Sequence, residues 1–165
     1  MRLRTVLLGD RNTIAGTVYG TIMVLAALTA GVRTSRHDLW ELIAIAGSSV
    51  TVLWIAHVYA HGLGESVNEG HRLTVPEVGA IARRELAILL AAVPVLAAVA
   101  LGAFDLVRDE TALWIAFGVG VVSLTAQGIR YARLEHLGRA GGLLAIALNL
   151  ALGLAIIALK VAVTH

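Results

Sequence analysis

The stretch WIAHVYAHGLGE, residues 54–65, decides how the chain is interpreted, because it closes a long apolar segment that begins near Leu39. Its two histidines, His57 and His61, are four residues apart, and the carboxylate of Glu65 follows four residues later. A helix that faces lipid normally carries aliphatic side chains at such positions. The stretch therefore predicts a membrane-spanning helix whose end carries a stripe of polar side chains.

The composition of the whole chain also indicates a membrane protein. Of its 165 residues, 58% are hydrophobic and 15% are charged, whereas soluble domains average about 45–50% apolar and about 25% charged residues. The chain has no cysteine, which excludes disulfides, thiolate metal sites and cysteine nucleophiles. No basic run is interleaved with aromatic residues, so nucleic acid is not expected as a partner. The partner that the composition predicts is the lipid bilayer.

Five segments of the sequence are long enough to cross a bilayer, whose hydrocarbon core of about 30 Å takes roughly 20 helical residues. Inside lipid every backbone N–H and C=O must be paired within its own segment, which forces these spans to be helical. The sequence therefore predicts an all-α fold, a single transmembrane domain over residues 1–165 that consists of a bundle of five transmembrane helices. We expect the helices at about 13–32, 39–62, 75–104, 111–131 and 140–163.

Local signals describe the second and third of these helices more closely. Thr74 can cap the third helix, Pro76 suits its first turn, and Glu77 completes a capping box. Pro94 lies in the middle of the same span and should kink it. In the second helix, the glycines at 62 and 64 can interrupt the polar stripe, because glycine weakens a helix interior.

The distribution of basic residues predicts the orientation of the chain. With five spans, nine of the 13 basic residues lie on the same side as the N-terminus. The positive-inside rule places that side in the cytoplasm, so we expect an integral membrane protein with a cytoplasmic N-terminus, in a bacterial-type plasma membrane. The nine are Arg2, Arg4, Arg11, Arg72, Arg83, Arg84, Arg130, Arg133 and Arg139, and the opposite side holds Arg33, Arg36, Arg108 and Lys160.

Polar side chains are predicted to collect at the cytoplasmic ends of the second and fourth helices and at the start of the third, where Glu85 lies at the same depth. An ionisable residue inside a membrane is costly and usually faces water or the bundle interior. We therefore expect a vestibule that senses or passes protons or cations, in an oligomeric channel-like or transport protein. Five short helices scarcely enclose a pore, which predicts a homo-oligomer. The residues predicted to line this pathway or to gate it are His57, His61, Glu65, Gln127 and Arg130.

Two other functions fit the same residues. Histidines at i and i+4 on one helix face are typical of metal sites, and His57, His61 and Glu65 would then be the ligands of a membrane-embedded metal or cofactor-binding protein, an enzyme included. The sequence does not identify a cofactor, and it favours a protein without catalysis because no nucleophile has an adjacent base. Alternatively, the histidines only hold helices together in a non-catalytic accessory subunit of a larger membrane complex.

Small and amide side chains are candidates for helix packing. Gly16 and Gly20 are four residues apart in the first span, a spacing that lets two helix backbones approach closely. Packing within one subunit and association of two copies both fit this pattern. Asn149 lies near the middle of the last span and is a further candidate for helix packing.

Overall fold

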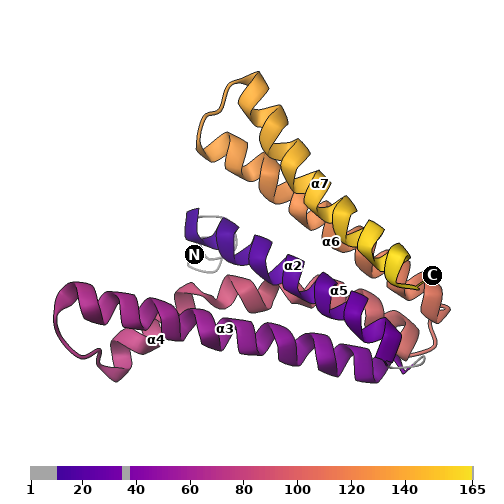
Figure 1. Cartoon of the computed structure of the whole chain (residues 1–165), viewed down its shortest axis with the longest axis horizontal. Coiled ribbons are helices and arrows are strands. Elements are labelled where there is room, and N and C mark those ends of the chain that lie inside the picture. The colour runs from indigo at the N-terminus through magenta and orange to yellow at the C-terminus, as the bar shows by residue number, and fades with distance from the viewer. Residues whose placement is uncertain (1–10, 35–37, 165) are drawn as a thin grey trace.

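The structure of the chain is a computed structural model, which describes residues 11–34 and 38–164. Within these ranges the side chains at 11, 12, 33, 34, 159, 160, 163 and 164 are left undescribed. Arg2, Arg4 and Arg36, which were used to predict the orientation, lie outside the described residues. The described part of the chain contains helices and no strand. The helices are α2 (Arg11–Thr34), α3 (Leu39–Glu69), α4 (Val75–Arg84), α5 (Leu86–Ala103), α6 (Asp109–Leu134) and α7 (Arg139–Thr164) (Figure 1).

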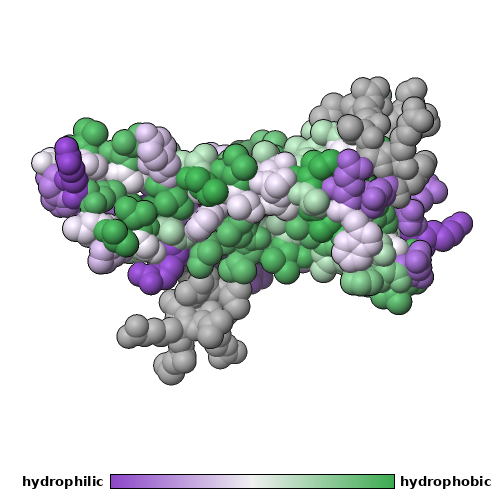
Figure 2. Space-filling view, turned by 90° about the horizontal axis from the view of Figure 1, so that it is seen from below, coloured by the Kyte–Doolittle hydropathy of each residue, from purple (hydrophilic) through white to green (hydrophobic). Residues whose placement is uncertain are grey.

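Five helical segments of the described chain are long and apolar enough to cross a membrane, which confirms the predicted all-α fold. The helices α4 and α5 together form the third of these segments, and each other segment is a single helix. On the face shown in Figure 2, hydrophobic residues cover most of the middle of the molecule and hydrophilic residues gather at both of its ends. This distribution matches an apolar membrane core between two polar interfaces. It indicates an integral membrane protein.

The helices α2 and α5 lie at the centre of the bundle (Figure 1). The helix α2 contacts α3 on one side and the pair α6 and α7 on the other. At the end where α2 begins, α6 and α7 diverge from α3 and α4 (Figure 1). The apolar core lies along the α2 and α5 axis and includes Leu25, Leu28, Ile88, Val95 and Phe117. This arrangement leaves the outer faces of α3 and α7 exposed.

Two glycines of α2, Gly16 and Gly20, pack against α5 within the same chain. A Cβ atom added at Gly20 would collide with the carbonyl oxygen of Ile88, and one added at Gly16 would lie 3.1 Å from the Cβ of Ala87. Absence of a side chain at both positions therefore lets the two backbones approach closely. In this structure the glycine pair serves packing inside one subunit.

The amide of Asn149 lies where α6 and α7 approach each other. Its Nδ2 donates a hydrogen bond to the carbonyl oxygen of Ala145, 3.0 Å away on the same helix. A Cβ atom added at Gly128 on α6 would lie 3.2 Å from this Nδ2 and 3.0 Å from the Ala145 oxygen. A glycine on α6 therefore makes room for the amide and for the backbone of α7.

Two helix boundaries differ from the sequence-based expectation. The helix α3 continues through Gly62 and Gly64 and ends only at Glu69. The residue that caps it is Gly70, whose φ of 70° is the left-handed conformation that glycine adopts readily. The third span is interrupted at Glu85, between α4 and α5, whereas α5 continues through Pro94. The predicted capping box is present, since the Thr74 N–H and hydroxyl both donate to Glu77 Oε2.

Candidate functional site

A cavity of about 690 Å³ lies where α2, α3 and the junction between α4 and α5 meet. Five of its lining residues carry aromatic, basic or acidic groups, and the other five are apolar residues or glycine. The small apolar side chains make room for the cavity, and the other five side chains provide its hydrogen-bonding and ionisable groups. The first set is Tyr19, His57, His61, Arg84 and Glu85, and the second is Ala15, Gly16, Leu53, Ala56 and Ala60.

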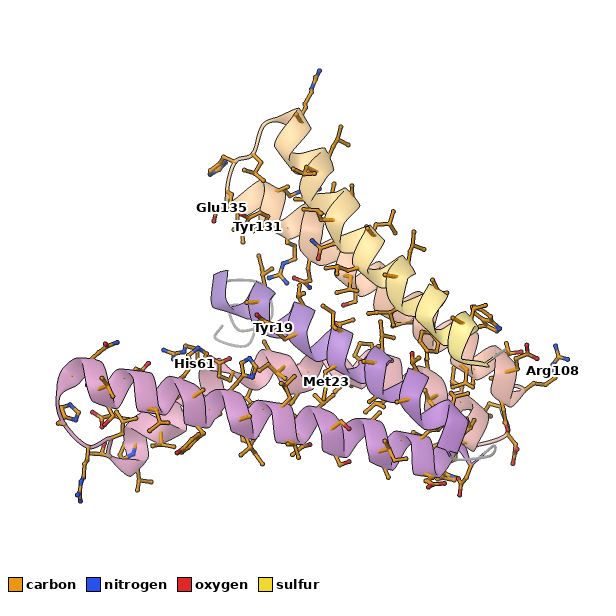
Figure 3. All side chains as sticks on the ribbon, in the orientation of Figure 1. Tyr19, Met23, His61, Arg108, Tyr131 and Glu135 are labelled. Carbon is orange, nitrogen blue, oxygen red and sulfur yellow. The ribbon has the colours of Figure 1, made fainter. Side chains whose placement is uncertain are left out.

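The helical spacing of α3 places both histidines on the wall of the cavity. Residues four apart lie on the same helix face, so His57 and His61 follow each other along the helix, with ring centroids 6.1 Å apart. The ring of Tyr19 on α2 lies 5.4 Å from that of His57. Figure 3 shows Tyr19 and His61 in the space between α2 and α3. The three rings thus form one continuous polar wall.

Glu85 supplies the acidic group of the site. It is only 7% exposed, and its Oε1 lies 3.1 Å from Nδ1 of His61 and 3.6 Å from Nε of Arg84. The break between α4 and α5 occurs at this residue, which ends one helix and caps the next. A buried carboxylate is costly unless it is paired. The His61 ring, which is half exposed, and the Arg84 guanidinium are the groups that compensate it.

The hydrogen bonds of the two histidines fix which ring nitrogen carries a proton in the neutral form. His57 Nδ1 lies 3.1 Å from the Leu53 carbonyl oxygen, which can only accept a hydrogen bond. His61 Nδ1 faces the Glu85 carboxylate, which as an ion also only accepts. In both neutral rings the proton therefore lies on Nδ1, and Nε2 is left as an acceptor. Each histidine can take up one further proton at Nε2.

The structure separates the predicted site residues into two groups. His57 and His61 line the cavity, and Glu65 is connected to it because Arg84 Nη2 donates a hydrogen bond of 2.9 Å to Glu65 Oε1.

Gln127 and Arg130 are not among the residues that line this cavity. They lie together on α6, where Arg130 Nη1 donates to Gln127 Oε1 at 3.0 Å and the buried Nη2 of Arg130 has no hydrogen-bond partner among the residues that the structure describes.

Two cavity residues, Tyr19 and Arg84, were not predicted for the site, and Glu85 was placed at the same end of the bundle without being counted among the pathway residues. A signal for Glu85 does exist in the sequence, since it is the last charged residue before the apolar run of α5. Arg84 precedes it directly and entered the sequence analysis only as one of the basic residues that predict the orientation. For Tyr19 no signal exists, because a single aromatic residue in an apolar helix is ordinary.

A possible set of metal ligands occurs elsewhere, in the turn between α3 and α4. Glu69, His71 and Glu77 each offer a ligand atom, and these atoms lie within 4.8 Å of one another. Within the described parts of the chain, His57, His61 and Glu65 form no such group. The ligand atoms of these three residues therefore do not meet at one point where a metal ion could bind. Glu65 is paired with Arg84 instead, and His61 with Glu85.

Comparison of the chain with protein-family models, with curated proteins and with solved structures gives no match. The function is therefore argued from the geometry of the cavity.

Proposed function

We propose that this membrane protein is a channel-like or transport protein in which the cavity between α2, α3 and the α4–α5 junction senses or passes protons or cations. The observation that carries the proposal is the buried carboxylate of Glu85, 3.1 Å from His61 on the wall of a cavity of about 690 Å³. Ionisable groups at membrane depth are typical of ion and proton pathways.

The arrangement offers a short series of proton acceptors. Histidine titrates near neutral pH, so it can take up and release protons under physiological conditions. Nε2 of His57 and Nε2 of His61 are acceptors in the neutral rings, and the Glu85 carboxylate lies 3.1 Å from Nδ1 of His61. The chain Glu65, Arg84, Glu85, His61 alternates in charge once His61 is protonated. A proton or cation that enters the cavity would meet the acidic group beside His61.

The pathway across the membrane would be completed by further copies of the chain. Five helices scarcely enclose a pore, and the described bundle has an apolar core of Leu25, Ile88, Val95 and Phe117 along its centre. A homo-oligomer with the N-terminus on the cytoplasmic side, as the positive-inside rule predicts, would open each cavity toward the cytoplasm.

Flux measurements in liposomes test the proposal. Purified protein should dissipate an imposed pH or cation gradient, followed with a dye enclosed in the vesicles. The double variant His57→Ala and His61→Ala should lose most of this flux and its pH dependence, because both proton acceptors of α3 are removed.

The matched control is His71→Ala, which removes an exposed histidine in the α3–α4 turn outside the cavity. Flux that is unchanged in the double variant would contradict the role of the cavity. Flux that is lost equally in the control would mean that the loss is not specific to the cavity.

A further inference from the structure

A second hollow, of about 430 Å³, lies between α3 and α4 on the other side of α3 from the histidine cavity. Most of its lining residues are apolar, and Arg72 is the one charged residue among them. Several of its apolar side chains are openly exposed, with Tyr59 at 68% and Leu63 at 50%. An exposed apolar groove with a single basic residue in its lining is complementary to a molecule with an apolar tail and an anionic head.

The length of α3 places the groove across the boundary between hydrocarbon and headgroups. At 1.5 Å per residue, α3 is about 46 Å long, which matches the roughly 40–45 Å of a bilayer with its headgroup layers. Trp54, at the inner end of the groove, lies about 22 Å from the start of the helix, within the hydrocarbon region. Arg72 follows the end of the helix and therefore lies at the level of the headgroups.

The charge of Arg72 is not neutralised by the acidic residues nearest in sequence. Glu69 forms an ion pair with Nε2 of His71 at 3.0 Å. Glu77 accepts the hydrogen bonds of the Thr74 capping box. The ion pairs found in the described part of the chain do not include Arg72. Its guanidinium is therefore available to a phosphate, which arginine recognises well.

We propose that the groove between α3 and α4 is a binding site for a phospholipid with an anionic headgroup. One acyl chain lies along α3 between Trp54 and Leu63, and Leu73 and Val78 cover it from the side of α4. The lipid phosphate contacts Arg72. Anionic lipid would thus bind with its head fixed by charge and its tail by apolar contact.

Quenching of tryptophan fluorescence tests this site, because Trp54 lines the groove and the chain has three tryptophans. Substitution of Trp40→Phe and Trp114→Phe leaves Trp54 as the reporter. The protein is placed in vesicles in which a lipid with brominated acyl chains, either phosphatidylglycerol or phosphatidylcholine, replaces part of the unlabelled lipid. Phosphatidylglycerol should reach half-quenching at about fivefold lower mole fraction, the preference expected from one arginine at an anionic headgroup.

The charge variants decide whether Arg72 is responsible. Arg72→Gln should reduce quenching by phosphatidylglycerol to the level of phosphatidylcholine, while Arg83→Gln should leave the preference intact. The control removes the same charge from an exposed residue of α4 that is not among the groove residues. Equal quenching by the two lipids, equal effects of the two arginine variants, or no quenching by either lipid would overturn the proposal.

A second measurement keeps the test independent of the tryptophan substitutions. Native mass spectrometry of the unsubstituted protein, released from mixed vesicles, should retain phosphatidylglycerol in preference to phosphatidylcholine. Arg72→Gln should abolish this preference and Arg83→Gln should not. Glycerophosphate at millimolar concentration, which carries the headgroup chemistry without a tail, should not displace the lipid. Displacement would mean that Arg72 binds free phosphate compounds and that the groove does not hold an acyl chain.

Discussion

At the scale of single residues, the site depends on how Glu85 is compensated. Its buried carboxylate faces His61 at 3.1 Å, and the Arg84 contact is longer, at 3.6 Å. Removal of a partner from a buried charged group leaves that group unsatisfied, whereas removal of both partners together costs less than the sum of the single changes.

A double-mutant cycle with His61→Ala and Glu85→Gln should therefore show coupling. Because His61 is half exposed, we expect a coupling free energy at the low end of the usual range, about 0.5–1 kcal/mol. The measurement is the free energy of unfolding in mixed micelles for the wild type, both single variants and the double variant. If the two single effects simply add, the His61 and Glu85 side chains do not interact and the description of the site fails.

Helical spacing predicts only those parts of the site that lie on one helix. The positions of His57 and His61 on one face follow from their spacing of four residues. The approach of Glu85 to His61 does not, because it requires the chain to turn back through α4 and to break at Glu85. Tyr19 joins the site through the packing of α2 against α3, which no local pattern encodes.

At the scale of helices, close packing of α2 on α5 depends on Gly20. Gly20→Ala should lower the free energy of unfolding by about 1–3 kcal/mol, the usual cost of forcing extra volume into a packed interface. The matched control is Gly118→Ala on α6, where an added Cβ meets no atom within 4 Å. Unfolding in mixed micelles compares the two variants. A loss of stability at Gly118 as large as at Gly20 would assign the effect to the helix backbone and not to the contact with α5.

The boundaries of the helices were predicted where the sequence contains a cap and missed where tertiary contacts decide. Thr74 and Glu77 place the start of α4 correctly, because a capping box acts locally. The end of α3 was expected near Gly62, whereas packing against α4 carries the helix on to Glu69. In particular, a Cβ added at Gly62 would lie 3.4 Å from Leu73, so the turn after α3 folds back onto the helix.

At the scale of the whole molecule, each predicted span carries the chain across the membrane, so successive loops should lie on opposite sides. This topology can be tested. The chain has no cysteine, so single cysteines introduced in the loops report sidedness without background. Asn68→Cys, at the end of α3, should react with an impermeant maleimide only in inverted membrane vesicles, and Leu106→Cys should react in intact cells. Both positions are exposed. The opposite pattern would reverse the predicted orientation, and labelling of both from one side would contradict the number of spans.

Hydropathy was sufficient to predict the architecture because lipid restricts a chain to paired helices. It could not predict the divergence of α6 and α7 from α3 and α4, which separates Gln127 and Arg130 from the histidines. That separation depends on where glycines permit close contact, such as Gly120 against Leu25 and Gly128 against Ala145.

The contact between α2 and α5 also limits how copies of this chain can meet in a membrane. The face of α2 that carries Gly16 and Gly20 is already occupied by Ala87 and Ile88 of the same chain. A dimer through that face would first have to pull the subunit apart. The proposed homo-oligomer would have to use other faces of the bundle, and a search for cross-links between copies can begin at the exposed apolar faces of α3 and α7.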